Sequence, residues 1–367
     1  MNSKLLDELG LQILRKLTEE NNLSSIARSL GVSRETVRRR IKHAEGPLGR
    51  MCLRIDLYSL GLSQVVVLNE RRAKRNELPL SIYIKSAAYT YTVNNVRYLV
   101  TATPPLNALN EYLTYLKALV GKKAEVYLTY PPLYWIPDLT YIRDPNNPFL
   151  YNWEELPRDV REAPTKPKIF LGSLPGKLAK LDRIDSYILN ELEKNPLKSI
   201  RSIARKRGIS QQLAHYHYKN HVMPIILSRN LRIFLNEEES FKGLFLIEFC
   251  SDDYLNKFIN VFISLPHCLA ILPEITKPRL LLNYQVYIYQ YADFIRAFSE
   301  LKELGIIEYI KDLGFFTKSI FIKRALPWNA LLPSGWVVEN FVKKLLNKVR
   351  LSYNSIEKIE VKLWEHR

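Results

Sequence analysis

Hydrophobic residues recur at helical spacing in two separate parts of the chain. They are Leu6, Leu9, Ile13, Leu14 and Leu17 in the first part, and Leu181, Ile184, Ile188 and Leu192 in the second. Steps of three and four residues place such side chains on one face of a helix. A second helix is predicted to end at Gly31 and at Gly208, since glycine suits the left-handed residue that closes a helix. A third helix follows, capped by Ser33 or Ser210. The pattern predicts two helix-turn-helix units.

The two units align as an internal repeat. The segment 6–14 lines up with 181–189, and the run Ile26-Ala27-Arg28 lines up with Ile203-Ala204-Arg205. Gly31 and Ser33 then match Gly208 and Ser210, with order kept and spacing nearly kept. A repeat of this kind indicates two copies of one structural unit.

A second pattern follows each unit. In the first copy we expect strands at 51–58, 63–69, 88–93, 97–103 and 124–130, with helices at 78–87 and 106–120. In the second copy we expect strands at 244–250, 269–272, 280–290, 307–310 and 319–323, with helices at 253–264 and 292–304. The order strand-helix-strand-strand-helix-strand predicts a ferredoxin-like antiparallel sheet with two helices. The predicted class is α+β, with two copies of a winged-helix-like helix-turn-helix unit and a βαββαβ domain.

Proline and aromatic residues fill the segment between the copies. Nine of the twenty prolines lie between residues 131 and 175, which disfavours regular helix and central strand. We expect an extended segment that lies across one or both halves. The tail predicts an amphipathic helix at 337–349 and an edge strand at 356–363. The predicted domain boundaries are 1–48, 49–130, 131–177, 178–228, 229–326 and 327–367.

The charge of the chain favours a polyanionic partner. The 367 residues carry a formal net charge of +17 with a pI near 9.6, and nucleic acid is the first candidate for such a protein. A solubilising surface is the alternative. No apolar run is long enough for a membrane span. We expect no signal peptide, because the N-terminal residues are acidic and amphipathic. We expect a cytoplasmic, nucleoid-associated protein. Its three separated cysteines favour neither a disulfide framework nor a zinc finger.

The third helix of the first unit is rich in arginine. Val37 and Ile41 would face the core of the unit. The candidate DNA-binding residues here are Ser33, Arg34, Arg38, Arg39, Arg40 and Lys42. Arg34 and Arg38 lie near the start of the helix, where a recognition helix meets base edges. The others would contact phosphates. A further cluster of cations at 71–75 could add a phosphate contact or be a solvated loop.

The second unit carries different chemistry. Its candidate DNA-binding residues are Arg205, Arg207, Ser210, Gln211, Gln212, His215 and Lys219. Glutamine can read adenine, so a different base preference is expected. A degenerate copy kept for packing or protein contact is the alternative. His217 and His221 are four residues apart and could share a metal, but no acid or cysteine is near them in the sequence. We expect solvent or DNA contact there and no metal site.

The run 181–192, together with Ser202-Ile203-Ala204-Arg205 and Gly208-Ile209-Ser210, resembles the N-terminus of Lrp/AsnC regulators. The first copy is similar but has Gly10 where Asp185 stands in the second. The resemblance implies a bacterial- or archaeal-type transcription factor in a duplicated form. This sequence lacks the glycine-rich turn that receives an amino-acid effector in many members. Siroheme decarboxylases, which work as paired similar subunits, also resemble this family and imply a different function.

Three functions remain open from the sequence. The first is regulation of transcription through double-stranded DNA bound in the major groove, with one chain acting as a pseudo-dimer on an asymmetric operator. A homodimer through sheet edges or the tail is possible. The second is a siroheme decarboxylase-like enzyme, and the third is an architectural DNA or protein assembly factor. Motifs for nucleotide binding and hydrolysis are absent from the sequence. We therefore expect no enzyme and no cofactor, and the sequence identifies no effector.

Overall fold

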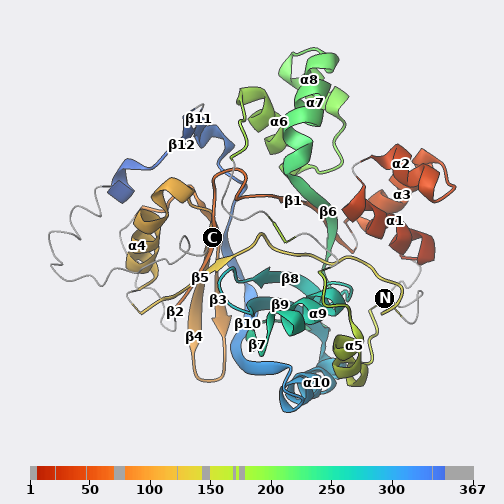
Figure 1. Ribbon diagram of the computed structural model, residues 1–367, viewed down its shortest axis with the longest axis vertical. Coiled ribbons are helices and arrows are strands. Elements are labelled where there is room, and N and C mark those ends of the chain that lie inside the picture. The colour runs from red at the N-terminus through yellow and green to blue at the C-terminus, as the bar shows by residue number, and fades with distance from the viewer. Residues whose placement is uncertain are drawn as a thin grey trace.

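The computed structural model describes residues 6–20, 22–46, 48–69, 79–121, 123–142, 149–167, 171–172, 178–332 and 334–343, with the side chains of 317–321 left aside. Both predicted helix-turn-helix units are present (Figure 1). The first comprises α1 (Glu8–Glu19), α2 (Leu23–Ser29) and α3 (Arg34–Ala44), and the second comprises α6 (Arg183–Lys194), α7 (Ile200–Arg207) and α8 (Gln211–His217).

The predicted caps account for the bounds of these helices. The hydroxyls of Ser33 and Ser210 accept hydrogen bonds from backbone amides in the first turns of α3 and α8. Gly208 ends α7 with φ +74°, in the left-handed region. Asp182 and Asp185 form a reciprocal capping box at the start of α6. Each helix therefore begins and ends where its local chemistry requires.

An antiparallel ribbon connects the two halves. It pairs β1 (Gly49–Ile55) with β6 (Ile226–Ile233). The first of these strands was expected in a sheet domain, and the sequence did not predict the second. Each helix-turn-helix unit also packs against the other half of the chain. Helix α1 of the first unit packs against β6, and the core of the second unit is continuous with the first sheet domain. The two halves are thus interlocked, and neither unit is independent of the other copy.

The sheet domains join edge to edge in one eight-stranded antiparallel sheet. Its first four strands are β2 (Gln64–Asn69), β3 (Ile84–Tyr91), β4 (Val96–Ala102) and β5 (Glu125–Thr129). The others are β7 (Ser240–Phe249), β8 (Cys268–Pro273), β9 (Arg279–Tyr287) and β10 (Ile307–Lys323). The order is β5-β2-β4-β3-β10-β7-β9-β8. Each half places its fourth, first, third and second strands side by side, which confirms the ferredoxin-like prediction.

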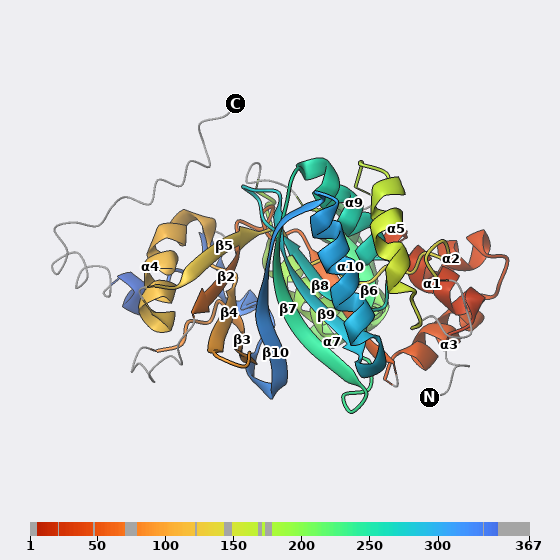
Figure 2. The ribbon, with the colours of Figure 1, turned by 90° about the horizontal axis from the view of Figure 1, so that it is seen from below.

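The sheet curls so that its two edges meet. Thr129, the last residue of the edge strand β5, pairs with Glu274, which directly follows the other edge strand β8, and the amide of Tyr130 donates to the carbonyl of Pro273 at 2.9 Å. Helix α4 (Leu109–Val120) covers the outer face of the first half, and α9 (Asp252–Phe262) and α10 (Tyr291–Glu303) cover that of the second (Figure 2). The inner face holds a separate apolar cluster that includes Leu68, Leu246 and Leu281. The sheet therefore packs on both faces.

The connecting segment crosses the second half as predicted, with one difference. Leu133 bridges to Ile271 of β8, and Trp135 is fully buried. The segment also contains a short helix, α5 (Leu156–Glu162), which has Pro157 in its first turn, where proline is tolerated. Helix α5 packs on α9, so the segment is part of the core.

Two further expectations need correction. Residues 84–87 belong to β3 and not to the predicted helix 78–87, while residues 70–78, with the cation cluster at 71–75, lie outside the described residues. A single strand, β10, replaces the two predicted at 307–310 and 319–323. Most of the predicted tail helix and the whole edge strand at 356–363 lie outside the described residues.

Short elements complete the fold. The 3₁₀ turns are Leu106–Ala108, Trp153–Glu155, Met223–Ile225, Ile288–Gln290 and Trp328–Ala330, and a π-helical turn at Tyr218–Val222 extends α8. A small hairpin pairs β11 (Leu331–Leu332) with β12 (Gly335–Trp336). Over the described part of the chain, every helix is too short or too polar to cross a membrane.

Candidate nucleic-acid interface

Helix α3 presents a cationic face to solvent. Val37 and Ile41 are buried in the core of the unit, as the spacing predicted. Arg34, Arg38, Arg39 and Lys42 are exposed. Among the described residues, no carboxylate pairs with Arg34, Arg39 or Lys42. Three cations are thus free to meet an anionic ligand without breaking a contact of the folded unit.

Two arginines of α3 form ion pairs with carboxylates. The guanidinium of Arg38 donates to both carboxylate oxygens of Glu35, at 2.8 and 2.9 Å, and the exposed pair lowers the pKa of Glu35 through that hydrogen bond. Arg40 lies 2.7 Å from Asp7 at the start of α1. Arg38 can exchange Glu35 for a base edge, because an exposed ion pair contributes little. Arg40 instead links the third helix to the first, and its predicted phosphate contact would require breaking that link.

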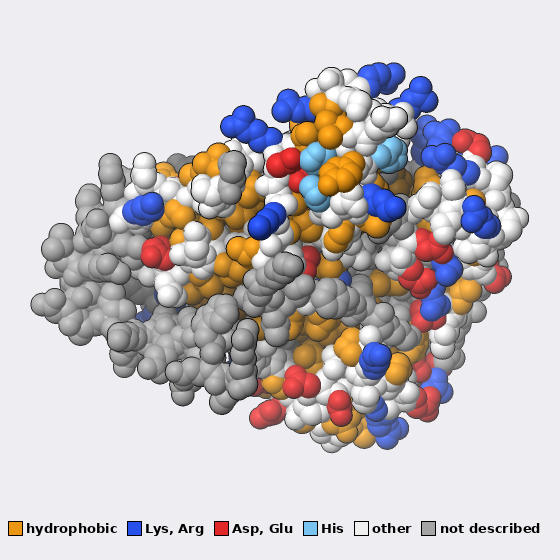
Figure 3. All heavy atoms as spheres, turned by 45° about the horizontal axis from the view of Figure 1, so that its top comes forward, with side chains coloured by type: hydrophobic (Ala, Val, Ile, Leu, Met, Phe, Trp, Pro, Cys, Tyr) orange, Lys and Arg blue, Asp and Glu red, His pale blue; other side chains and the backbone are white. Residues whose placement is uncertain are grey.

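The second unit carries its cations mainly on α7. Arg201, Arg205 and Arg207 are exposed, and the guanidinium of Arg207 lies 5.1 Å from the ring centroid of Tyr187. Lys206 reaches back to Glu191 at 3.0 Å. Figure 3 shows lysine and arginine side chains around the helix-turn-helix end of this face. The candidate residues Arg205 and Arg207, on the helix that precedes the recognition helix, are therefore on the surface.

Helix α8 exposes the polar side chains predicted from the sequence. Ser210 caps it, and Gln211, Gln212 and His215 are exposed, as are Leu213 and Tyr216 of the same helix and Lys219 of the π-helical turn that follows. The two recognition helices belong to units on either side of the β1–β6 ribbon (Figure 1). The structure thus brings the candidates of each unit together on one helix or helix pair, while the two sets stay on separate units.

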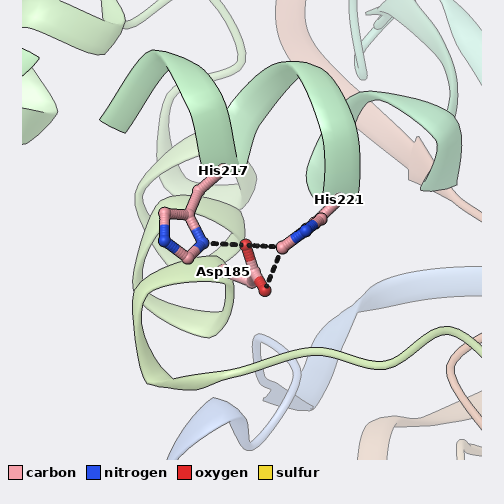
Figure 4. Close-up of side chains that lie close together, drawn as sticks. All are labelled: Asp185, His217 and His221. Atoms are coloured by element: carbon pink, nitrogen blue, oxygen red, sulfur yellow. Dashed lines mark hydrogen bonds and ion pairs between the residues drawn. The ribbon is translucent and has the colours of Figure 1, made fainter. Parts of the chain in front are cut away.

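The predicted solvent or DNA contact is wrong for His217, which is buried, while His221 is partly exposed. His217 is only 7% exposed, and its Nδ1 lies 2.9 Å from Oδ1 of Asp185, while Nδ1 of His221 lies 3.1 Å from Oδ2 of the same carboxylate (Figure 4). Asp185 is fully buried and belongs to α6. An acid is therefore near both histidines in space although none is near in sequence.

The repeat contained a signal for this contact. Aligned through the serine caps, His217 takes the position of Arg40, and aligned through the first helices (6–14 with 181–189), Asp182 takes that of Asp7. Arg40 pairs with Asp7 in the first unit, and Nδ1 of His217 lies 3.6 Å from Asp182 in the second. This position of the third helix contacts the carboxylates of the first helix in both copies. Reading the two helices as a pair, rather than α8 alone, would have indicated it.

Comparison with known proteins supports one unit directly. A family model described as winged helix-turn-helix DNA-binding matches residues 181–220. No curated protein sequence matches the chain.

Several solved structures are similar to the chain at low identity. Siroheme decarboxylase NirDL has 9% identity and a TM-score of 0.46, with 94% of this chain and all of that chain covered. The same enzyme in complex with an iron-uroporphyrin III analogue has 10% identity and a TM-score of 0.45, over 93% of this chain and 99% of that chain. The leucine response regulatory protein LrpA of Mycobacterium tuberculosis has 19% identity and a TM-score of 0.22, over 34% of this chain and 90% of that one. What the chain contains is a winged helix-turn-helix domain within a tandem α+β architecture.

Proposed function

We propose that the protein binds double-stranded DNA through its two non-identical helix-turn-helix units, with regulation of transcription as the consequence. The observation that carries the proposal is the exposed cationic face of α3, where Arg34, Arg39 and Lys42 project from a helix whose other face holds the core. A recognition helix enters the major groove with its N-terminal residues toward the bases. The match of residues 181–220 to a DNA-binding domain supports the same role for the second unit.

The residues of α3 divide into two roles. Arg34 and Arg38 lie in its first two turns and would meet base edges, where arginine pairs bidentately with guanine. Arg39 and Lys42 would meet phosphates, which position the protein without reading sequence. To contact a base, Arg38 must release the carboxylate of Glu35. The contact is thereby an exchange of one acceptor for another.

The second unit would read a different sequence. Gln211 and Gln212 stand in the first turn of α8, where α3 has Arg34 and Glu35. Glutamine pairs with adenine. The exposed cations of α7, the helix before α8, would contact the phosphate backbone of the DNA. Because one chain holds both units through the β1–β6 ribbon, the operator would consist of two unlike half-sites.

A mobility-shift assay with the full chain tests this function. The chain should bind duplex DNA with an affinity that falls steeply with salt, and a preferred duplex should compete better than a scrambled one. Absence of binding at low salt would refute the proposal. Steep salt dependence without sequence preference would favour the architectural role.

A second candidate function rests on a group of cations away from the recognition helices. Arg50 and Arg232 lie directly opposite each other in the β1–β6 ribbon, and like charges in that position are destabilising. Burial lowers the pKa of Lys323, and the charges of Arg232 and Arg50 lower it further. Among the described residues no carboxylate pairs with these three. An anionic ligand would relieve their repulsion.

A carboxylate-rich tetrapyrrole fits this chemistry, and decarboxylation of siroheme is the corresponding activity. Siroheme added to the full chain should then change its visible absorption in a saturable way. The double variant Arg50→Ala/Arg232→Ala should abolish that change and leave DNA binding intact. An unchanged spectrum would exclude this second function, whatever the DNA assay gives.

A further inference from the structure

The contact between α6 and α8 brings three metal-ligating side chains together. Asp185 lies on α6, His217 ends α8, and His221 lies in the π-helical turn that follows. Their ligand atoms all lie within 4.8 Å of one another. Figure 4 shows both imidazole rings turned toward the carboxylate from the other helix. A π-helical turn inside a helix is itself frequent at functional sites.

The distances fit a tetrahedral ion. Zn²⁺ with ligands at about 2.0–2.1 Å requires ligand atoms about 3.3 Å apart. Nδ1 of His217 lies 2.9 Å from Asp185 Oδ1, and Nδ1 of His221 lies 3.2 Å from the same oxygen. Shifts of a few tenths of an ångström would suit these two edges. The third edge, between the two imidazole nitrogens, lies within 4.8 Å and can be adjusted by rotation of the rings.

The surroundings of the cluster suit a bound ion. Asp185 has no exposed surface, while the His221 side chain is 32% exposed, so the cluster has a rigid inner ligand and an open outer side. Asp182 adds a second carboxylate, 3.6 Å from Nδ1 of His217. One oxygen of Asp185 accepts the backbone amide of Asp182, which orients the ligand as second-shell contacts do in metal sites.

The first unit serves as an internal comparison. Gly10 and Ala44 stand at the positions of Asp185 and His221, and the direct ion pair of Arg40 with Asp7 connects the helices. The second unit has replaced that guanidinium with an imidazole and added two further ligands. A cation is thus supplied by the chain in one unit, while the other unit offers a site for one.

We propose that Asp185, His217 and His221 bind a divalent transition-metal ion, with Zn²⁺ as the ion that best suits two imidazoles and a carboxylate. The ion holds the recognition helix α8 against α6. Solvent or Asp182 completes the coordination. Metal binding here does not depend on the DNA-binding function, so each is tested without the other.

Zinc titration of the full chain tests the site. Protein freed of metal by a chelator and dialysed is titrated with Zn²⁺ by calorimetry, and with Co²⁺ by visible absorption. One ion should bind per chain, with the intense absorption of tetrahedral Co²⁺. Affinity for Zn²⁺ should be lower in acidic than in neutral buffer, since protons compete with the metal ion for its ligands.

Variants locate the ion. Asp185→Asn and His221→Gln should each weaken Zn²⁺ binding by more than about 100-fold, which exceeds the usual loss from a second-shell change. His43→Gln removes an exposed histidine outside the cluster and should bind as the wild type does. Asp185 also caps α6, so His221→Gln decides the matter if Asp185→Asn does not fold. A wild-type chain with no saturable Zn²⁺ binding, or one that His221→Gln leaves unchanged, would mean a hydrogen-bonded cluster only and overturn the proposal.

Discussion

Replacing Arg39 and Lys42 together by alanine isolates the phosphate contacts of the first recognition helix. Both side chains are exposed and, among the described residues, neither pairs with a carboxylate, so the fold of the unit should not change. Each phosphate contact contributes about 0.9 to the slope of log affinity against log salt. The double variant should therefore lower that slope by about 1.8.

The slope fixes the affinity loss. If the wild-type and variant lines meet near 1 M salt, a slope difference of about 1.8 corresponds to roughly 60-fold weaker binding at 0.1 M. The double variant Lys277→Ala/Lys302→Ala is the matched control, because it removes the same charge from exposed positions on the second sheet domain. Mobility shifts over a salt series give both slopes.

Two results of this comparison would contradict the proposed contacts of α3. Equal slopes for the wild type and the Arg39→Ala/Lys42→Ala variant would refute the placement of α3 on DNA. Equal losses for that variant and the control would mean that net charge alone, and not α3, governs binding.

Four further outcomes are expected. Glu35→Gln should strengthen DNA binding, since it frees Arg38 and removes a negative charge. Arg38→Ala should weaken binding by about 1–3 kcal/mol and relax the preference at one base pair. Competition assays with single-base variants of the DNA measure both effects, and identical preferences in the two protein variants would contradict the role of Arg38. Gly208→Ala should destabilise the fold by about 1–2 kcal/mol, because a Cβ there meets no neighbour but φ is +74°; denaturant unfolding measures it, and an unchanged midpoint would be inconsistent with a strained C-cap. Hydrogen bonding by Lys198, and also by Lys206, holds the pKa of Glu191 below its ordinary value of 4.5. The stability it provides is present above pH 4.5 and is lost as pH falls through the lower folded-state pKa, so Glu191→Gln should flatten acid unfolding curves, and an identical pH dependence in both proteins would argue against the assignment.

Local chemistry made the helix-turn-helix units predictable. Serine caps, a left-handed glycine and apolar residues at helical spacing act within a few residues, and all are visible in the sequence. The succession of strands along the chain in each sheet domain was predicted from the same kind of periodicity. Strand β6, with the sequence ILSRNLRI, escaped prediction because arginine, serine and asparagine interrupt its apolar pattern and its partner β1 lies far away in the chain.

Long-range contacts made the rest unpredictable. Nothing local indicates that β3 pairs with β10, or that Thr129 meets Glu274 to bring the sheet edges together. The contact of Asp185 with His217 likewise joins residues 32 positions apart. The candidate DNA-binding residues of α3 were identified correctly as exposed, with the exception of Arg40, whose partner Asp7 lies on another helix.

Selection of bound duplexes from a random DNA pool by the full chain tests the central claim most directly. Two unlike half-sites should be enriched, one with guanine for the arginines of α3 and one with adenine for the glutamines of α8. Their centres should lie about one helical turn, ~34 Å, apart or a multiple of it. No enriched sequence, or a perfect palindrome bound by a single chain, would contradict the account.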